Sequence, residues 1–185
     1  MAKPLWITLI LIALGLILGT LGAVSIPVGM GVTEFWPGIL VQAVGGIWFG
    51  LWGGLIAAVA FPMLSNILIG GSLVQIVGFM PSNALQGVIP CWAFRHFKMS
   101  PSIPGWRGIL FFAVWGCLIP NLVGGLIGPA VLVMTGNLDW ASYPGFAWAW
   151  CLGNAVPAFV LGVPLLRFGT RMLDEARLLI KGYWH

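Results

Sequence analysis

Charged residues are scarce in this sequence: Lys, Arg, Asp and Glu make up 6% of its 185 residues, and Asp and Glu together number four. Hydrophobic residues make up 60%, and the mean hydropathy is +1.04. A soluble domain of this size needs a charged, solvated surface, which this composition cannot provide. The composition therefore predicts an integral membrane protein.

Cysteine and histidine are also few, and they form no metal or redox pattern. Cys91, Cys117 and Cys151 lie far apart in apolar surroundings without a Cys-x-x-Cys spacing, so we expect buried thiols rather than a disulfide or a metal site. The GxxxxGK[ST] phosphate-binding loop is missing, which excludes ATP hydrolysis by this chain. No His, Asp or Glu falls in a predicted membrane segment, so we expect neither an enzyme nor a resident cofactor.

Apolar segments of the length that spans a bilayer, about 20 residues, recur along the chain. Short loops leave room for about six of them and for no soluble domain, so 1–185 is predicted to be a single polytopic all-α domain. The first segment is longer than a signal-peptide core and is expected to be retained. The six predicted helices cover about 5–24, 36–49, 55–69, 73–94, 108–134 and 145–167.

The stretch 34–66 is predicted to form a helical hairpin in the membrane. It begins with Trp36-Pro37-Gly38, and proline is tolerated in the first turn of a helix. The glycine-rich segment 50–54 is predicted to be the tight turn between the two helices of the hairpin. Glycines elsewhere in the stretch would let helix backbones approach closely.

The charges are segregated in the six-helix interpretation. With the amino terminus in the cytoplasm, the two acids outside the tail, Glu34 and Asp139, fall on the outer side and every basic residue falls on the cytoplasmic side. Both termini are thus predicted to be cytoplasmic, and the net charge of +4 reflects topology rather than nucleic-acid binding. Residues 168–185 are predicted to form a short amphipathic cytoplasmic tail. The basic residues are Lys3, Arg95, Lys98, Arg107, Arg167, Arg171, Arg177 and Lys181.

Neutral polar residues interrupt the apolar helices, and an amide in hydrocarbon is costly unless it is paired or faces a cavity. Asn83, Asn121 and Asn154 each lie within three residues of a proline, so a carbonyl released by a kink could pair with the amide. Two interpretations stay open: the amides hold helices together, or several of them line one polar cavity. The residues concerned are Asn66, Gln75, Asn83, Gln86, Asn121 and Asn154.

Aromatic and acidic residues gather beside the predicted outer loops. They suit an interfacial aromatic belt and solvated loops, or the mouth of a pocket for a flat, hydrogen-bonding ligand. No Arg or Lys on the outer side could hold a phosphate, so a neutral or weakly cationic heterocycle is the expected substrate. The predicted substrate-binding residues are Glu34, Trp36, Asn66, Gln75, Asn83, Asn121, Asn137, Asp139, Trp140, Tyr143 and Asn154.

The Pro37-Gly38 start and the sequence GGIWFGLWGG at 45–54 resemble the substrate-binding S-components of energy-coupling factor (ECF) vitamin transporters. Members of that family often have a proline where this chain has Leu51. Size, six helices and a long first outer loop agree along the whole chain. The resemblance implies capture and uptake of a vitamin or related molecule across a prokaryotic cell membrane, together with a transmembrane coupling subunit and cytosolic ATPase subunits.

The resemblance also implies a partner-docking face on the first helix, where the family has an Ala-x-x-x-Ala pattern. Ala13, Gly15, Gly19 and Ala23 place small residues at that spacing, with internal packing as the alternative. Metal-transporting members have a histidine near residue 2, and this chain does not, so a transition-metal substrate is not expected. The competing functions are a ligand-sensing membrane domain and a solitary carrier that works without ATPase subunits.

Overall fold

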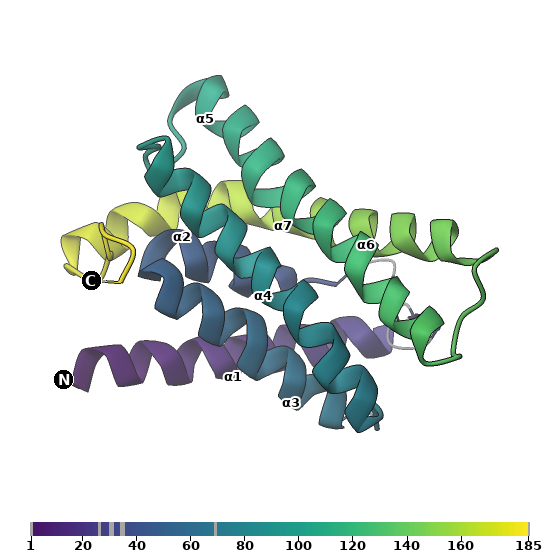
Figure 1. Ribbon diagram of the computed structural model, residues 1–185. Helices are drawn as coiled ribbons and strands as arrows, with labels where there is room; N and C mark the ends of the chain where they lie inside the picture. Colours follow the sequence, from purple (N-terminus) through teal and green to yellow (C-terminus); the bar gives the residue numbers. More distant parts are fainter. Residues whose placement is uncertain (1, 26, 30–31, 34–35, 69, 185) are drawn as a thin grey trace.

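The computed structural model describes the whole chain except residues 1, 26, 30–31, 34–35, 69 and 185, and it describes no side chains at 2–5 and 21–35. The described residues form helices, of which η1 and η2 are π-helical, and one small antiparallel pair of strands (Figure 1). The elements are α1 Ala2–Ser25, β1 Pro27–Gly29, β2 Val32–Thr33, α2 Ile39–Leu55, η1 Ile56–Ala60, α3 Phe61–Leu68, α4 Leu73–His96, α5 Gly105–Phe111, η2 Phe112–Leu118, α6 Ile119–Met134 and α7 Tyr143–Glu175.

The chain reverses direction inside α2, at Gly50. This residue has φ +74° and ψ −168°, a combination open essentially to glycine alone. In a straight helix Gly46 and Gly54 would be about 12 Å apart, yet a Cβ built on Gly54 would lie 3.1 Å from the Cα of Gly46. The predicted helical hairpin is therefore present, and its turn is confined to Gly50 rather than spread over 50–54.

Glycines hold the hairpin against α4. A Cβ on Gly87 of α4 would lie 2.5 Å from the carbonyl oxygen of Gly54 and 2.7 Å from the Cβ of Ala58, and a Cβ on Gly46 would collide with the Gly87 carbonyl oxygen. Three backbones thus meet where only hydrogen atoms fit. Close packing of this kind is the main source of attraction between helices in an apolar environment.

The prolines do not divide the predicted helices. α4 passes through Pro81 and Pro90 without interruption, and α7 continues through its internal prolines for 33 residues. In the stretch 105–134 the helix changes from α-helical to π-helical hydrogen bonding instead. The π-helical segment η2 ends just before α6, and Pro120 lies in the first turn of α6. Such π segments accommodate residues that cannot join the regular ladder.

Pro157 in α7 fixes where the hairpin begins. A proline has no N–H for the carbonyl four residues earlier, which here belongs to Gly153. The backbone N–H of Trp36 donates to that carbonyl oxygen at 2.8 Å. The indole N–H of Trp36 donates to the Gly19 carbonyl of α1 at 3.1 Å. α2 therefore begins in the middle of the bundle, between α1 and α7.

The two ends of the bundle differ in their connections. Figure 1 shows both chain termini at one end, together with the connection from α4 to α5, and the connection from α6 to α7 at the opposite end. The first of these ends carries Arg95, Lys98, Arg171 and Lys181, which line one pocket there. Asp139 belongs to the α6–α7 connection. Glu34, the other acid expected at that end, lies outside the described residues, so Asp139 alone bears on the expected separation of charge.

The lateral surface of the bundle is apolar. Met134, Leu73 and Phe168 expose 83%, 74% and 74% of their surface, more than a water-soluble protein leaves in contiguous patches. The helical stretches Ile39–Leu68, Gly105–Met134 and Tyr143–Glu175 are long and apolar enough to cross a membrane. The first of them is folded back at Gly50, so it consists of two shorter limbs.

The C-terminal tail differs from the predicted amphipathic helix. α7 ends at Glu175 because Arg177 adopts φ +55°, and the Leu178 N–H then bonds the Leu173 carbonyl oxygen at 2.9 Å. This pattern is a Schellman helix end, which is usually built with glycine. Residues 178–184, called here the C-terminal strap, continue without helical structure and lie against the turn at Gly50.

Candidate functional site

Buried amides from α2, α4 and α6 meet inside the bundle. The Gln86 side-chain N–H donates to Asn121 Oδ1 at 2.7 Å, and Gln42 donates to Asn83 Oδ1 at 3.2 Å. The Ser82 hydroxyl donates to the carbonyl oxygen of Gly124 at 3.1 Å. All four amide side chains are at least nine-tenths buried. We call this group, together with Asn154, the amide layer.

Asn154 belongs to the same level of the bundle. A Cβ on Gly125 of α6 would touch Cys151 of α7, and because the two helices are antiparallel, one turn further along each leads to Asn121 and Asn154. Both amides bond a carbonyl of their own helix, but it is the one four residues before the amide and not the one that the nearby proline releases, so the expected pairing with a released carbonyl is not what the structure has. Asn121 donates to the Cys117 carbonyl at 2.7 Å, and Asn154 donates to the Trp150 carbonyl at 2.9 Å.

The amide layer leaves polar atoms without a protein partner. Gln42 Oε1, Gln86 Oε1 and Asn154 Oδ1 are buried acceptors that receive no hydrogen bond, and the indole N–H of Trp150 is a buried donor without an acceptor. An unpaired buried polar group costs about 1–3 kcal/mol. The set is dominated by acceptors, so a molecule that pairs with it must mainly donate hydrogen bonds.

Trp36, another predicted site residue, contacts the residue that precedes Asn154. Its backbone N–H bonds Gly153, the residue before Asn154, and its ring stacks on Phe61 with a centroid separation of 5.7 Å. Glu34, which was expected beside it at the mouth of the pocket, lies outside the described residues.

The other predicted site residues are engaged within their own segments or with one neighbouring helix. Asn66 donates to the Pro62 carbonyl at 2.8 Å, and Gln75 forms a capping box with Ser72 at the start of α4. Tyr143 donates through its hydroxyl to the Leu126 carbonyl at 2.8 Å, and its ring lies 5.6 Å from that of Trp140, which is 69% exposed. Asn137 bonds the hydroxyl and carbonyl of Thr135.

Small residues proposed for partner docking on α1 face different ways. A Cβ on Gly15 would collide with the Phe61 ring, and one on Gly19 would lie 3.1 Å from it, so both glycines serve internal packing in this structure. Ala13 is exposed. The side chain of Ala23 lies outside the described residues. A docking role for this face of α1 stays a prediction.

Asp139 caps the turn that leads into α7. The Ser142 backbone N–H donates to Asp139 Oδ1 at 2.6 Å. This bond, with further bonds from the Ser142 side chain and the Ala141 backbone, holds the pKa of the carboxyl below its usual range. One oxygen of the carboxylate therefore stabilises the loop through the bond from the Ser142 N–H, and the other oxygen remains able to make a further contact.

The cap at Asp139 predicts a pH dependence for this loop. Because the pKa is lowered by bonds that exist only in the folded loop, their stabilisation is complete above the ordinary aspartate pKa of about 3.9 and is lost only as the pH falls below it. The protection of the Ser142 amide, measured as its exchange rate relative to the intrinsic rate at the same pH, should persist at about pH 4.5 and be lost in Asp139→Ala at every pH. In Asp139→Asn, which still accepts the bond, the protection should no longer depend on pH; loss of protection already at about pH 5 in the parent protein would contradict the assignment.

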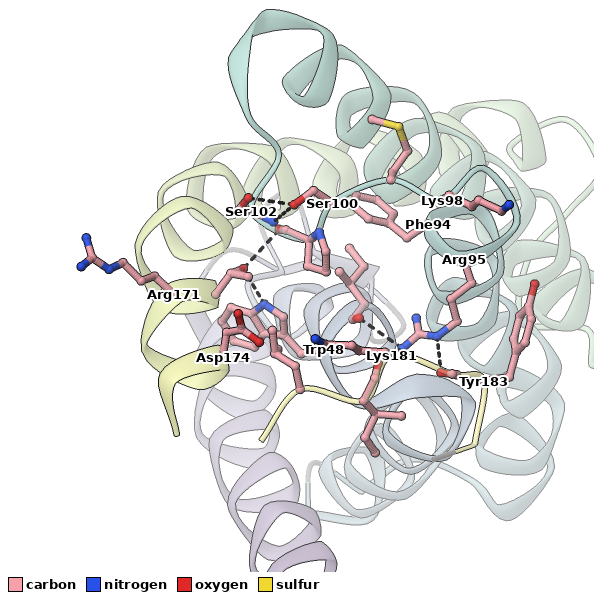
Figure 2. A pocket seen from close by; sticks show the side chains of 17 residues that line it. Trp48, Phe94, Arg95, Lys98, Ser100, Ser102, Arg171, Asp174, Lys181 and Tyr183 are labelled. Carbon is pink, nitrogen blue, oxygen red and sulfur yellow. Dashed lines mark hydrogen bonds between the residues drawn. The ribbon is translucent and has the colours of Figure 1, made fainter. Parts of the chain in front are cut away.

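A pocket lies at the end of the bundle that carries Arg95, Lys98, Arg171 and Lys181, called here the basic end. It is enclosed by the hairpin turn, the α4–α5 connection, α7 and the C-terminal strap. It has a volume of about 650 Å³ and is shown in Figure 2. Its wall is fixed by the Trp48 indole N–H, which donates to Thr170 Oγ1 at 2.8 Å, and by the Thr170 hydroxyl, which donates to the Pro101 carbonyl at 3.2 Å. We call this hollow the basic-end pocket.

Arg95 holds the C-terminal strap at this pocket. The break at Gly50 deprives the Ile47 carbonyl of its usual helical donor, the Leu51 N–H, and the guanidinium group donates to that carbonyl and to the one of Gly46. The strap completes the arrangement, because the Leu51 N–H donates to the Tyr183 carbonyl at 2.7 Å. The five carbonyl acceptors of the Arg95 side chain belong to Gly46, Ile47, Cys91, Ile180 and Gly182.

Two residues of these sites escaped the sequence analysis. Gln42 could have been found, because it is a lone amide in an apolar helix and the cost that singled out Asn83 applies to it equally. Arg95 could not, because a basic residue at a helix end is expected from topology alone. Within the described part of the chain, no three His, Cys, Asp or Glu side chains lie close enough to hold a metal ion.

The chain was compared with known protein families, with characterised proteins and with solved structures, and none of the three comparisons found a match.

Proposed function

We propose that the chain is a six-pass membrane protein that captures a small, neutral or weakly cationic molecule from the outer side, as the substrate-binding subunit of an ECF-type transporter. The observation that carries the proposal is the amide layer, whose buried acceptors lack protein donors in the middle of an apolar bundle. A ligand with N–H or O–H donors would satisfy them. Intramembrane polar groups of this kind are functional sites by default.

The arrangement of charge supports the orientation. Arg95, Lys98, Arg171 and Lys181 line one pocket at the end of the bundle that holds both termini (Figure 1), and the positive-inside rule assigns that end to the cytoplasm. The amide layer would then lie at mid-depth, and a ligand from the outer side would reach it from the end that holds the α6–α7 connection. No cation of the described chain lies at that depth, which disfavours an anionic substrate.

The hairpin supports the six-pass count. Its two limbs, 39–49 and 51–68, run antiparallel against α4, and with α1, α4, the stretch 105–134 and α7 they make an even number of passes. An even number is what termini on one side require. The assignment to the S-components rests, beyond the six-pass count, on the resemblance of the glycine-rich sequence at the turn.

Native mass spectrometry of the detergent-purified protein tests the binding site. Gln86→Leu combined with Asn121→Leu removes both partners of one hydrogen bond, so stability should change little while the Gln86 acceptor is lost. We expect a smaller fraction of the double variant than of the parent protein to carry a co-purified small molecule, by an amount that corresponds to about tenfold weaker binding. Ser82→Ala is the matched control. Ser82 lies in the same layer, but its hydroxyl is not one of the unpaired acceptors, so its removal takes no binding group away from a ligand.

Unchanged occupancy in a folded Gln86→Leu/Asn121→Leu protein would contradict the site. The transport role has a separate test. A substrate-binding subunit should co-purify with coupling and ATPase subunits from its native membrane and should not transport alone in vesicles. Transport by the isolated chain would instead identify a solitary carrier.

A further inference from the structure

The basic-end pocket has a charge that its own residues do not balance. Arg95, Lys98, Arg171 and Lys181 line it, against the single carboxylate of Asp174. Glu175 forms an ion pair with Arg171 at 2.8 Å on the exposed face of α7. This ion pair does not involve Arg95, Lys98 or Lys181. The pocket therefore carries a positive potential that attracts an anion.

Arg95 contributes its charge from inside the wall. Its N–H groups bond backbone carbonyls, which are neutral, so the guanidinium charge is held in place without a carboxylate beside it. The side chain is partly buried, and a charge in that position is less screened than one in bulk water. In Figure 2, Lys98 and Arg171 extend away from the centre of the pocket on opposite sides, at its rim.

Neutral donors and apolar surface complete the lining. The Ser100 and Ser102 hydroxyls lie 2.9 Å apart on the α4–α5 connection, at the pocket wall. The lining also includes the apolar side chains of Trp48, Phe94 and Ile180. A site that combines ammonium groups and hydroxyls with apolar walls suits an amphiphile whose polar part is a phosphate.

The position of the pocket identifies the source of that phosphate. Its α7 wall includes Thr170 and Arg171, and the neighbouring residues Phe168 and Met172 expose 74% and 71% of their surface on the outside of the bundle. Lipid-facing surface therefore begins beside the pocket. Anionic lipids are concentrated in the cytoplasmic leaflet, which the basic end would face. A free phosphate ion would fill only a small part of a volume of about 650 Å³.

We propose that the basic-end pocket binds the phosphate-bearing head group of an anionic phospholipid from the cytoplasmic leaflet. Lys181 and the serine hydroxyls hold the phosphate oxygens, Lys98 adds positive charge at the rim, and the apolar wall receives the glycerol and the start of the acyl chains. The lipid would bridge the α4–α5 connection, α7 and the C-terminal strap, which are the elements around the turn at Gly50. This site is separate from the amide layer and does not depend on which molecule, if any, is transported.

Lipid titration of the detergent-purified full chain, followed by native mass spectrometry, tests the proposal. Phosphatidylglycerol should bind at least about tenfold more tightly than phosphatidylcholine with the same acyl chains. The double variant Lys98→Glu/Lys181→Glu should lose this preference. The control Arg107→Glu/Arg167→Glu makes the same change in net charge with exposed residues that do not line the pocket, and it should keep the preference within about threefold.

The remaining arms of the experiment separate this site from other sources of binding. Glycerol 3-phosphate and inorganic phosphate at millimolar concentration should fail to displace the lipid; displacement by either would assign the pocket to a soluble phosphate and overturn the lipid assignment. Equal loss in both double variants would show a general effect of net charge and also overturn it. Size-exclusion profiles and thermal midpoints of the variants exclude misfolding as the cause of any loss.

Discussion

Replacing Gly50 with alanine should lower the free energy of unfolding by about 3 kcal/mol. The backbone at this position has φ +74° and ψ −168°, where any residue with a Cβ is strained. The added Cβ would also lie 2.5 Å from the carbonyl oxygen of Tyr183, the atom that accepts the Leu51 N–H. The substitution therefore strains the hairpin turn and pushes the C-terminal strap away from it in one step.

The controls for Gly50→Ala separate these two causes. Gly70 has φ +81° and no neighbour within 4 Å of its would-be Cβ, so Gly70→Ala measures the cost of a positive φ alone. Gly145→Ala, at a glycine with neither feature, should be close to neutral. Reversible unfolding by SDS titration in mixed micelles gives the three values. If Gly50→Ala costs no more than Gly70→Ala, the contact with Tyr183 contributes nothing.

The sequence was sufficient to predict the helices and the hairpin, because both depend on composition over many residues. Charge scarcity and segment length predicted long apolar helices, three of which are long and apolar enough to cross a membrane, and the glycines around Gly50 indicated a turn. The prolines were misleading. Their missing N–H groups were expected to release carbonyls for the nearby Asn amides, whereas one released carbonyl, that of Gly153, accepts the Trp36 N–H.

The amide layer was predictable in part, since the cost of a polar group in hydrocarbon falls on each residue separately. Asn83, Asn121 and Asn154 were identified in this way. Their partners were not, because a bond such as that between Gln86 and Asn121 depends on the axial register of two helices. Register is set by contacts like that of Gly87 with Gly54, which no local pattern in the sequence specifies.

The C-terminal strap could not be predicted from its own sequence. Residues 173–181 have the alternation of an amphipathic helix, and the helix does continue as far as Glu175. Beyond that point, tertiary contacts outweigh helical propensity. The Ile180 N–H donates to the Trp48 carbonyl at 2.9 Å, so the strap satisfies backbone groups that the turn at Gly50 leaves open.

Replacing Arg95 with alanine should release the C-terminal strap and lower the free energy of unfolding by about 3 kcal/mol or more. The guanidinium donates to carbonyls of the hairpin and of the strap, including those of Gly46 at 3.1 Å and Ile180 at 2.8 Å. Without it, these carbonyls lose a charged donor, and only the backbone bonds Leu51–Tyr183 and Ile180–Trp48 still join the hairpin to the strap among the hydrogen bonds described. Limited proteolysis after Arg177 and Lys181 should become at least about tenfold faster.

Arg95→Lys distinguishes the geometry of this contact from its charge. A lysine keeps the charge but has three donors on one atom, whereas the guanidinium spreads five donors over a planar fork that reaches two segments at once. We therefore expect Arg95→Lys to protect the strap little better than Arg95→Ala, while Lys98→Ala, which removes an exposed charge nearby, leaves proteolysis unchanged. Full protection in Arg95→Lys would mean that charge alone holds the strap, and the fork geometry would then have no part in joining the C-terminus to the hairpin turn.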